Sequence, residues 1–249
     1  MTVPERAPLG AALALLLAVV SLTGPLSPVL MAVAVGLLAL LIGLAWPSLL
    51  ELPSPGGTRA VVSGTGILGA LVTVLVPERF TPLSGVVMVC AIGVFASFAH
   101  QMLRSERREL TESLTGTIAG VFVSGIAACW VLAQSAALDS ASGSVVTAIA
   151  AGLAATLLMN STPLPSLLRF VLAALLGVAV TTLLAVSLAG VLPLLAVVIG
   201  LVTAIGAGCA HLLTGSSLVS REPAPSLAVA AVPVATVGVV AHLAVLLLP

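Results

Sequence analysis

Long apolar runs separated by short polar breaks make up almost the whole of this chain. A helix that crosses a bilayer needs about 20 apolar residues, with a range of about 17–25. Measured against that length, the runs predict nine helices, of which the first and the sixth are the shortest. They cover Leu9–Leu22, Ser27–Trp46, Ala60–Val76, Pro82–Leu103, Leu114–Gln134, Ser144–Met159, Leu167–Ala189, Leu192–Leu213 and Leu227–Leu248.

Helices are favoured over strands because the runs are long and rich in Leu and Ala, whereas a membrane barrel shows short segments of alternating apolar and polar residues. The breaks carry residues that end helices, such as Gly24-Pro25 and the stretch Pro53–Gly57. No break is long enough for a separate soluble domain. The sequence therefore predicts an all-α polytopic bundle that forms one integral membrane domain over residues 1–249.

Composition indicates the solvent that this bundle meets. The chain is 60% hydrophobic and 6% charged, whereas a soluble domain carries about 25% charged residues. A surface with so few charges is stable only against lipid, so the bilayer is the predicted partner. The formal net charge of +0 creates no field that would attract nucleic acid.

The arginines predict the orientation, because cytoplasmic loops are enriched in basic residues. With a cytoplasmic N-terminus and nine helices, seven arginines fall on the cytoplasmic side and only Arg79 falls outside. The opposite orientation reverses that ratio, so a cytoplasmic N-terminus is predicted. The seven are Arg6, Arg59, Arg104, Arg107, Arg108, Arg169 and Arg221.

The charged cluster from Arg104 to Glu112 lies between the fourth and fifth predicted helices. Arg104, Arg107 and Arg108 are candidates to bind an anionic lipid headgroup, because each basic residue at a membrane surface contributes about 1 kcal/mol to such binding. Three glutamates in the same stretch cancel positive charge. A solvated connector that fixes the topology is therefore the alternative interpretation.

Small residues recur every four positions in two of the predicted helices and form flat stripes that another backbone can approach closely. Packing within the chain is the first interpretation, and a homo-oligomer face or a contact within a larger membrane assembly is the alternative. The fifth helix carries Gly116, Gly120, Ser124 and Ala128, and the eighth carries Gly200, Ala204 and Gly208.

Polar and amphipathic residues inside the runs are further candidates. His242 lies well inside the last predicted helix, and a polar residue at that depth is a candidate for function. Asn160 opens a polar cytoplasmic loop ahead of Pro163 and is a second candidate. Trp46 and Trp130 stand near helix ends and are expected at the lipid–water interface, which amphipathic rings favour.

The types of residue that are missing narrow the function. No acidic residue lies inside an apolar run, and the single aspartate, Asp139, falls in a predicted outside loop. Metal-dependent phosphotransfer needs clustered carboxylates. The sequence therefore predicts no catalytic residue, no metal and no cofactor. It favours a non-enzymatic accessory or permease-like component of the membrane, with a lipid-handling protein as the alternative.

Two stretches, residues 46–55 and 98–116, resemble an uncharacterised family of actinobacterial integral membrane proteins. That resemblance implies a multi-pass protein of a bacterial plasma membrane and implies no activity. The last quarter of the chain is more weakly similar in layout to phosphatidate cytidylyltransferases, which are many-helix lipid enzymes. Their signature Lys, paired Asp and Gly-His-Gly-Gly run are absent from Thr214–Pro223. No catalytic residue carries over, and the resemblance implies a degenerate protein without activity.

Overall fold

The computed structural model describes residues 7–75, 82–104, 109–139, 143–215 and 223–248. Within these ranges the chain forms α-helices, one short 3-10 helix and no strand, so the predicted all-α fold is confirmed. The elements are α1 (Ala7–Ser21), η1 (Gly24–Leu26), α2 (Ser27–Leu49), α3 (Pro55–Leu75), α4 (Pro82–Met102), α5 (Leu110–Ile126), α6 (Cys129–Asp139), α7 (Gly143–Asn160), α8 (Ser166–Ala189), α9 (Pro193–Gly215) and α10 (Pro225–Leu247).

Local chemistry sets several helix ends. Four helices begin on proline, whose fixed φ suits the first helical position and whose missing N–H removes no helical hydrogen bond there. These prolines are Pro55, Pro82, Pro193 and Pro225. Helix α8 stops at Gly190, which has a φ of +63°, a left-handed conformation that glycine adopts without steric cost. The N–H of Val191 then donates to the carbonyl of Ala185 at 3.1 Å and closes the helix end.

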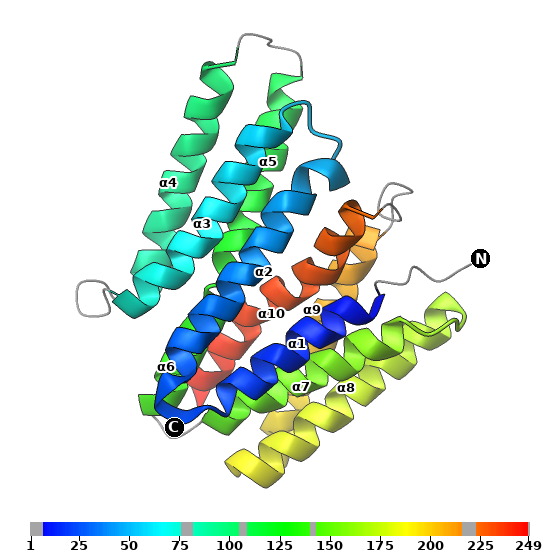
Figure 1. Cartoon of the computed structure of the whole chain (residues 1–249). Coiled ribbons are helices and arrows are strands. Elements are labelled where there is room, and N and C mark those ends of the chain that lie inside the picture. Colours follow the sequence, from blue (N-terminus) through cyan, green and yellow to red (C-terminus); the bar gives the residue numbers. More distant parts are fainter. Residues whose placement is uncertain (1–6, 76–81, 105–108, 140–142, 216–222, 249) are drawn as a thin grey trace.

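The chain reverses direction at each connection between passes, and α5 and α6 together make one pass (Figure 1). At one end of the bundle α3, α5, α8 and α10 begin. Arg59 and Arg169 stand near the starts of α3 and α8, and Arg104 follows the end of α4, so the three arginines that the structure describes lie at this end. We call it the arginine end. At the opposite end α1, α6 and α10 finish, and we call it the C-terminal end. The shared location of the three arginines agrees with the predicted threading.

Among the described residues, seven helical segments are long and apolar enough to cross a membrane. Helices α5 and α6 count as one of these segments, Leu110–Leu138. The shorter apolar helices are α1 and α7, which correspond to the two shortest predicted runs. By length and composition the chain is therefore a multi-pass helical membrane protein.

Helix α8 shows how the bundle meets its surroundings. Its buried residues recur every four positions and form one narrow stripe toward α7 and α9, whereas leucines such as Leu175 and Leu183 are exposed. The stripe is Ala173, Gly177, Thr181 and Ala185. A continuous apolar outer surface of this kind is unfavourable in water and stable against lipid.

Helix α10 lies at the centre of the bundle, in contact with α1, α2, α6 and α9 (Figure 1). Most of its side chains are buried, including small ones on every face. A helix that is apolar all round is expected at such a central position. The bundle therefore brings the middle of α10 against the second half of the fifth pass, where the candidate site lies.

Both tryptophans lie in the protein interior, which corrects their predicted place at the membrane interface. Trp130 is 0% exposed and Trp46 is 6% exposed. Trp130 Nε1 donates to the carbonyl of Val234 at 2.8 Å, and Trp46 Nε1 donates to the carbonyl of Gly116 at 2.8 Å. The interfacial preference is overridden because each indole N–H has a hydrogen-bond acceptor inside the bundle.

Candidate functional site

The fifth pass is interrupted inside the bundle. Ala127 and Ala128 separate α5 from α6, and the backbone there tightens to three-residue spacing. The N–H of Ala128 donates to the carbonyl of Gly125 at 3.0 Å, and the N–H of Trp130 donates to the carbonyl of Ala127 at 3.1 Å. Such a tightened turn within a helix often marks a functional hinge. The sequence predicted one continuous helix over Leu114–Gln134, because the run is apolar and long enough to cross a bilayer.

Helix α10 packs directly on this interruption. A Cβ built on Gly238 would lie 2.8 Å from Cδ1 of Trp130 and 3.3 Å from the carbonyl oxygen of Ile126, so only glycine fits without a shift. Pro233 stands inside α10, where it removes one helical N–H and disturbs the preceding turn. We call this contact, formed by Trp130, Val234 and Gly238, the α6–α10 seam.

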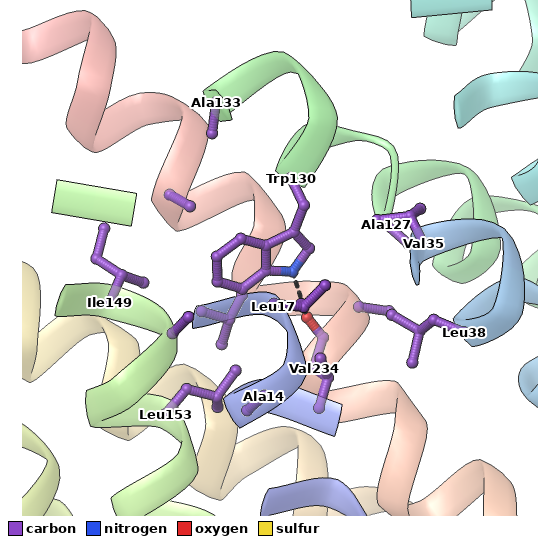
Figure 2. Packing of buried hydrophobic residues seen from close by; sticks show 14 of the residues in the cluster. Ala14, Leu17, Val35, Leu38, Ala127, Trp130, Ala133, Ile149, Leu153 and Val234 are labelled. Carbon is purple, nitrogen blue, oxygen red and sulfur yellow. Dashed lines mark hydrogen bonds between the residues drawn. The ribbon is translucent and has the colours of Figure 1, made fainter. Parts of the chain in front are cut away.

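Figure 2 shows that the Trp130 ring fills the junction of five helices. Ala14 and Leu17 of α1, Val35 and Leu38 of α2, and Ile149 and Leu153 of α7 surround it, and its N–H points to the Val234 carbonyl. A buried aromatic ring of this size dominates the local packing energy. The seam is therefore held by one large side chain, although the two backbones that it joins are locally weakened.

A buried polar layer lies just beyond the seam, toward the C-terminal end. Gln134 Nε2 donates to Ser27 Oγ at 2.8 Å and to the carbonyl of Ser21 at 3.3 Å. Ser21 Oγ and Thr147 Oγ1 lie 2.6 Å apart and share a hydrogen bond. Ser21 Oγ also donates to the carbonyl of Ala18 at 2.7 Å. We call Ser21, Ser27, Gln134 and Thr147 the polar layer; it joins α1, α2, α6 and α7.

Two polar atoms at this level have no partner. Gln134 is 0% exposed, and its Oε1 accepts no hydrogen bond. His242 is 6% exposed, and its Nδ1 is likewise unpaired. Both residues stand five positions before the end of their helices, α6 and α10, which finish at the same end of the bundle. An unpaired polar atom in a dry interior is costly. Four hydroxyl groups elsewhere in the described residues, those of Ser124, Thr181, Thr182 and Thr203, are also unpaired; Gln134 and His242 differ from them in carrying an amide and an imidazole at the level of the polar layer.

The polar contacts at the arginine end are satisfied within the protein. Gln101 Nε2 donates to Ser113 Oγ at 2.8 Å, while Arg104 donates to Gln101 Oε1 at 2.8 Å and to Ser113 Oγ at 3.4 Å. Arg104 is half-buried and held against α4 and α5. The other two residues of the proposed headgroup site, Arg107 and Arg108, lie outside the described residues.

The predicted small-residue stripes lie against other parts of the same chain: Gly116 against the connection between α2 and α3, and the others against helices. In α5, Gly116 faces Leu52, whose Cδ2 would lie 2.8 Å from a Cβ on the glycine, and Gly120 faces Trp46. Ser124, further along, contacts Gly66 of α3. In α9, Gly200 lies against Val178 and Gly208 against Phe170, both of α8. Ala128 of the first stripe and Ala204 of the second are also buried.

The remaining candidates offer little chemistry. Asn160 is the last residue of α7, at the arginine end, and is buried. Cys90 and Cys129 are buried thiols, whereas Cys209 is exposed. In the part of the chain that the structure describes, no group of three or more His, Cys, Asp or Glu side chains is placed to hold a metal ion.

A cavity of about 240 Å³ at the C-terminal end is lined by apolar residues such as Val145, Leu195 and Leu248.

Searches of family models, curated proteins and solved structures return no match to the chain. The seam and the polar layer are therefore the features of the molecule that bear on its function. Sequence reasoning missed the part that Gln134 plays, although a signal was present. Gln101 and Gln134 are the only glutamines of the chain, and both stand in the last turn of a predicted apolar run, where a buried amide is costly unless it is paired.

Proposed function

We propose that this chain is a permease-like membrane protein that passes a small polar solute along the α6–α10 seam. The observation that carries the proposal is the interrupted pass beside a proline-containing helix, with a buried polar layer one turn beyond. Substrate sites of many transporters lie near the membrane midplane where helices are discontinuous. The accessory role that the sequence also allowed needs neither an interruption nor unpaired polar groups.

The groups along the proposed path suit a hydrogen-bonding solute. The described residues of the polar layer supply hydroxyl, amide and backbone carbonyl groups, and His242 adds an imidazole. Such groups exchange hydrogen bonds with a passing solute without binding it as tightly as a charged pair would. The seam would open when Trp130 moves away from Gly238, because this contact closes the space between the two helices.

Reaction of engineered cysteines with a water-soluble, membrane-impermeant maleimide tests the proposal. In a variant whose Cys90, Cys129 and Cys209 are replaced by serine, Ala235→Cys places a thiol three residues before Gly238, on the face of α10 toward α6. Val237→Cys is the matched control, because Ala235 and Val237 are both fully buried but Val237 lies off that face.

We expect Ala235→Cys to be labelled in reconstituted vesicles and Val237→Cys to remain unlabelled. A thiol at position 235 that reacts no faster than the one at position 237 would contradict the permease proposal and favour a packed accessory protein. The test needs no knowledge of the solute.

A second candidate function is the binding of anionic lipid at the arginine end. It is favoured by Arg104, whose guanidinium is held at the helix end by Gln101 and Ser113 and is therefore oriented before a lipid arrives. Binding to phosphatidylglycerol vesicles should fall for Arg104→Gln and change little for Arg59→Gln, a control at the same end of the bundle. Equal binding by both variants and the unmodified protein would remove this candidate.

A further inference from the structure

We propose that the polar layer is a binding site for a monovalent cation held by neutral oxygen atoms. The inference deepens the permease proposal by naming a second ligand, and it rests on that proposal only for its role in transport. Binding itself depends only on the contacts of Ser21, Ser27, Gln134 and Thr147.

The layer gathers oxygen atoms from three helices, α1, α2 and α7, near the Gln134 amide of α6. The Nε2 of Gln134 lies 2.8 Å from Ser27 Oγ and 3.3 Å from the carbonyl oxygen of Ser21. Ser21 Oγ and Thr147 Oγ1 continue the chain of contacts at 2.6 Å. The Nε2 of Gln134 thus lies between the Ser27 hydroxyl oxygen and the Ser21 carbonyl oxygen, which is the position that a small cation would occupy.

The Oε1 of Gln134 is buried and accepts no hydrogen bond, so it is free to serve as a ligand. The two ends of an amide have nearly the same shape, so a half-turn of the Gln134 side chain would direct Oε1 toward Ser27 Oγ and the Ser21 carbonyl. Without an ion that turn would bring two carbonyl oxygens together, which is unfavourable. With a cation between them, Oε1, the Ser21 carbonyl and the hydroxyl oxygens become its ligands. Nε2 of Gln134 then takes the position of Oε1, which has no hydrogen-bond partner, so the ion must contribute more than the two hydrogen bonds that Nε2 gives up.

The electrostatics of the site favour one positive charge. Helices α1, α6 and α10 end here, and each helix C-terminus carries a partial negative charge. The starts of α2 and α7 at the same end offset part of this field. Calcium and magnesium are usually held with carboxylate ligands, which the four residues do not supply. Sodium, potassium and ammonium are therefore the cations that fit.

Thermal unfolding of the purified full-length chain in detergent tests the inference. The melting temperature, Tm, is measured in sodium, potassium, ammonium or choline chloride at equal ionic strength, and choline is too large for the site. A ligand at a hundred times its dissociation constant should raise Tm by roughly 5 °C or more. A rise with sodium or potassium identifies a metal ion, and a rise with ammonium alone identifies an amine ligand. Equal Tm values in all four salts would overturn the inference.

The chain offers a matched control for the central residue. Gln101 is also a buried glutamine that donates to a serine at 2.8 Å, but its Oε1 already accepts a hydrogen bond from Arg104. Gln134→Leu should abolish the cation-dependent rise in Tm, whereas Gln101→Leu should lower Tm in every salt and keep the rise. A rise that persists in Gln134→Leu would contradict the assignment.

Two further variants keep the test decisive if Gln134→Leu does not fold. Gln134→Glu retains an oxygen ligand and should bind the cation at least as tightly as the unmodified protein. Ser27→Ala removes one ligand and should raise the cation concentration needed for half of the effect about tenfold. Half-effect concentrations that stay unchanged in Ser27→Ala would also refute the site. The maleimide test at position 235 is independent of this result, so failure of the cation site and failure of the permease proposal are distinguishable.

Discussion

At the residue scale, the surroundings of each glycine decide whether it is needed. Two of the glycines of helix α9, Gly206 and Gly208, are two positions apart in the sequence, and only Gly208 is packed against another helix. Gly208 lies against the ring of Phe170, whose Cε2 would be 2.6 Å from an added Cβ, whereas nothing lies within 4 Å of a Cβ on Gly206. A side chain at position 208 must therefore displace α8, and one at position 206 points into open space.

Substitution of these two glycines by leucine gives a prediction with an internal control. Gly208→Leu should lower the free energy of unfolding by about 1–3 kcal/mol, because overpacking forces neighbouring groups from their positions. Gly206→Leu should be neutral or stabilising by up to about 1 kcal/mol, because leucine favours the helix more than glycine does. Denaturation in mixed detergent micelles, followed by circular dichroism, measures both. Equal losses would show that the packing of α9 on α8 is not as described.

Residues whose role depends on a distant partner were the hardest to predict. The depth of His242 could be predicted from its place in an apolar run, and the structure places it in a buried position. The roles of Trp130 and Gln134 depend on Val234 and Ser27, which are about a hundred positions away in sequence. Nothing in the periodicity of a helix specifies such a pairing, so their hydrogen bonds could not be predicted.

At the element scale, the interruption of the fifth pass is the main departure from expectation. Glycine and alanine are common on both sides of it and no proline is present, so the run predicts a continuous helix. The break occurs where Trp130 turns its indole toward α10 and Gly238 allows the close approach. Tertiary packing, which a local pattern does not contain, therefore decides where α5 ends.

Replacement of each tryptophan by phenylalanine separates the seam from the rest of the bundle. Trp130→Phe loses the hydrogen bond to Val234, worth about 1 kcal/mol, and should increase deuterium uptake in α10 around residues 230–240. Trp46→Phe loses an equivalent bond to Gly116 and should increase uptake at the start of α5 only. Hydrogen exchange with mass spectrometry measures both. If deuterium uptake in α10 increased equally in both variants, Trp130 would not stabilise the seam more than Trp46 does.

At the scale of the whole molecule, the sequence predicted the class of fold and the approximate limits of each pass. Each of the nine predicted runs corresponds to one helix, or in the fifth case to the pair α5 and α6, within the described residues. This worked because bilayer thickness sets the length of an apolar helix. The order of helices around α10 could not be predicted, because apolar faces of similar shape do not specify their neighbours.

The central claim is that the chain crosses the bilayer with its arginine end in the cytoplasm, and labelling of single cysteines in intact cells tests it most directly. In a variant without its natural cysteines, Leu192→Cys lies in the exposed turn between α8 and α9, and Pro163→Cys lies in the exposed turn between α7 and α8. A membrane-impermeant maleimide should label position 192 in intact cells and position 163 only after the membrane is opened. Labelling of position 163 in intact cells, or of both positions from the same side, would contradict the account.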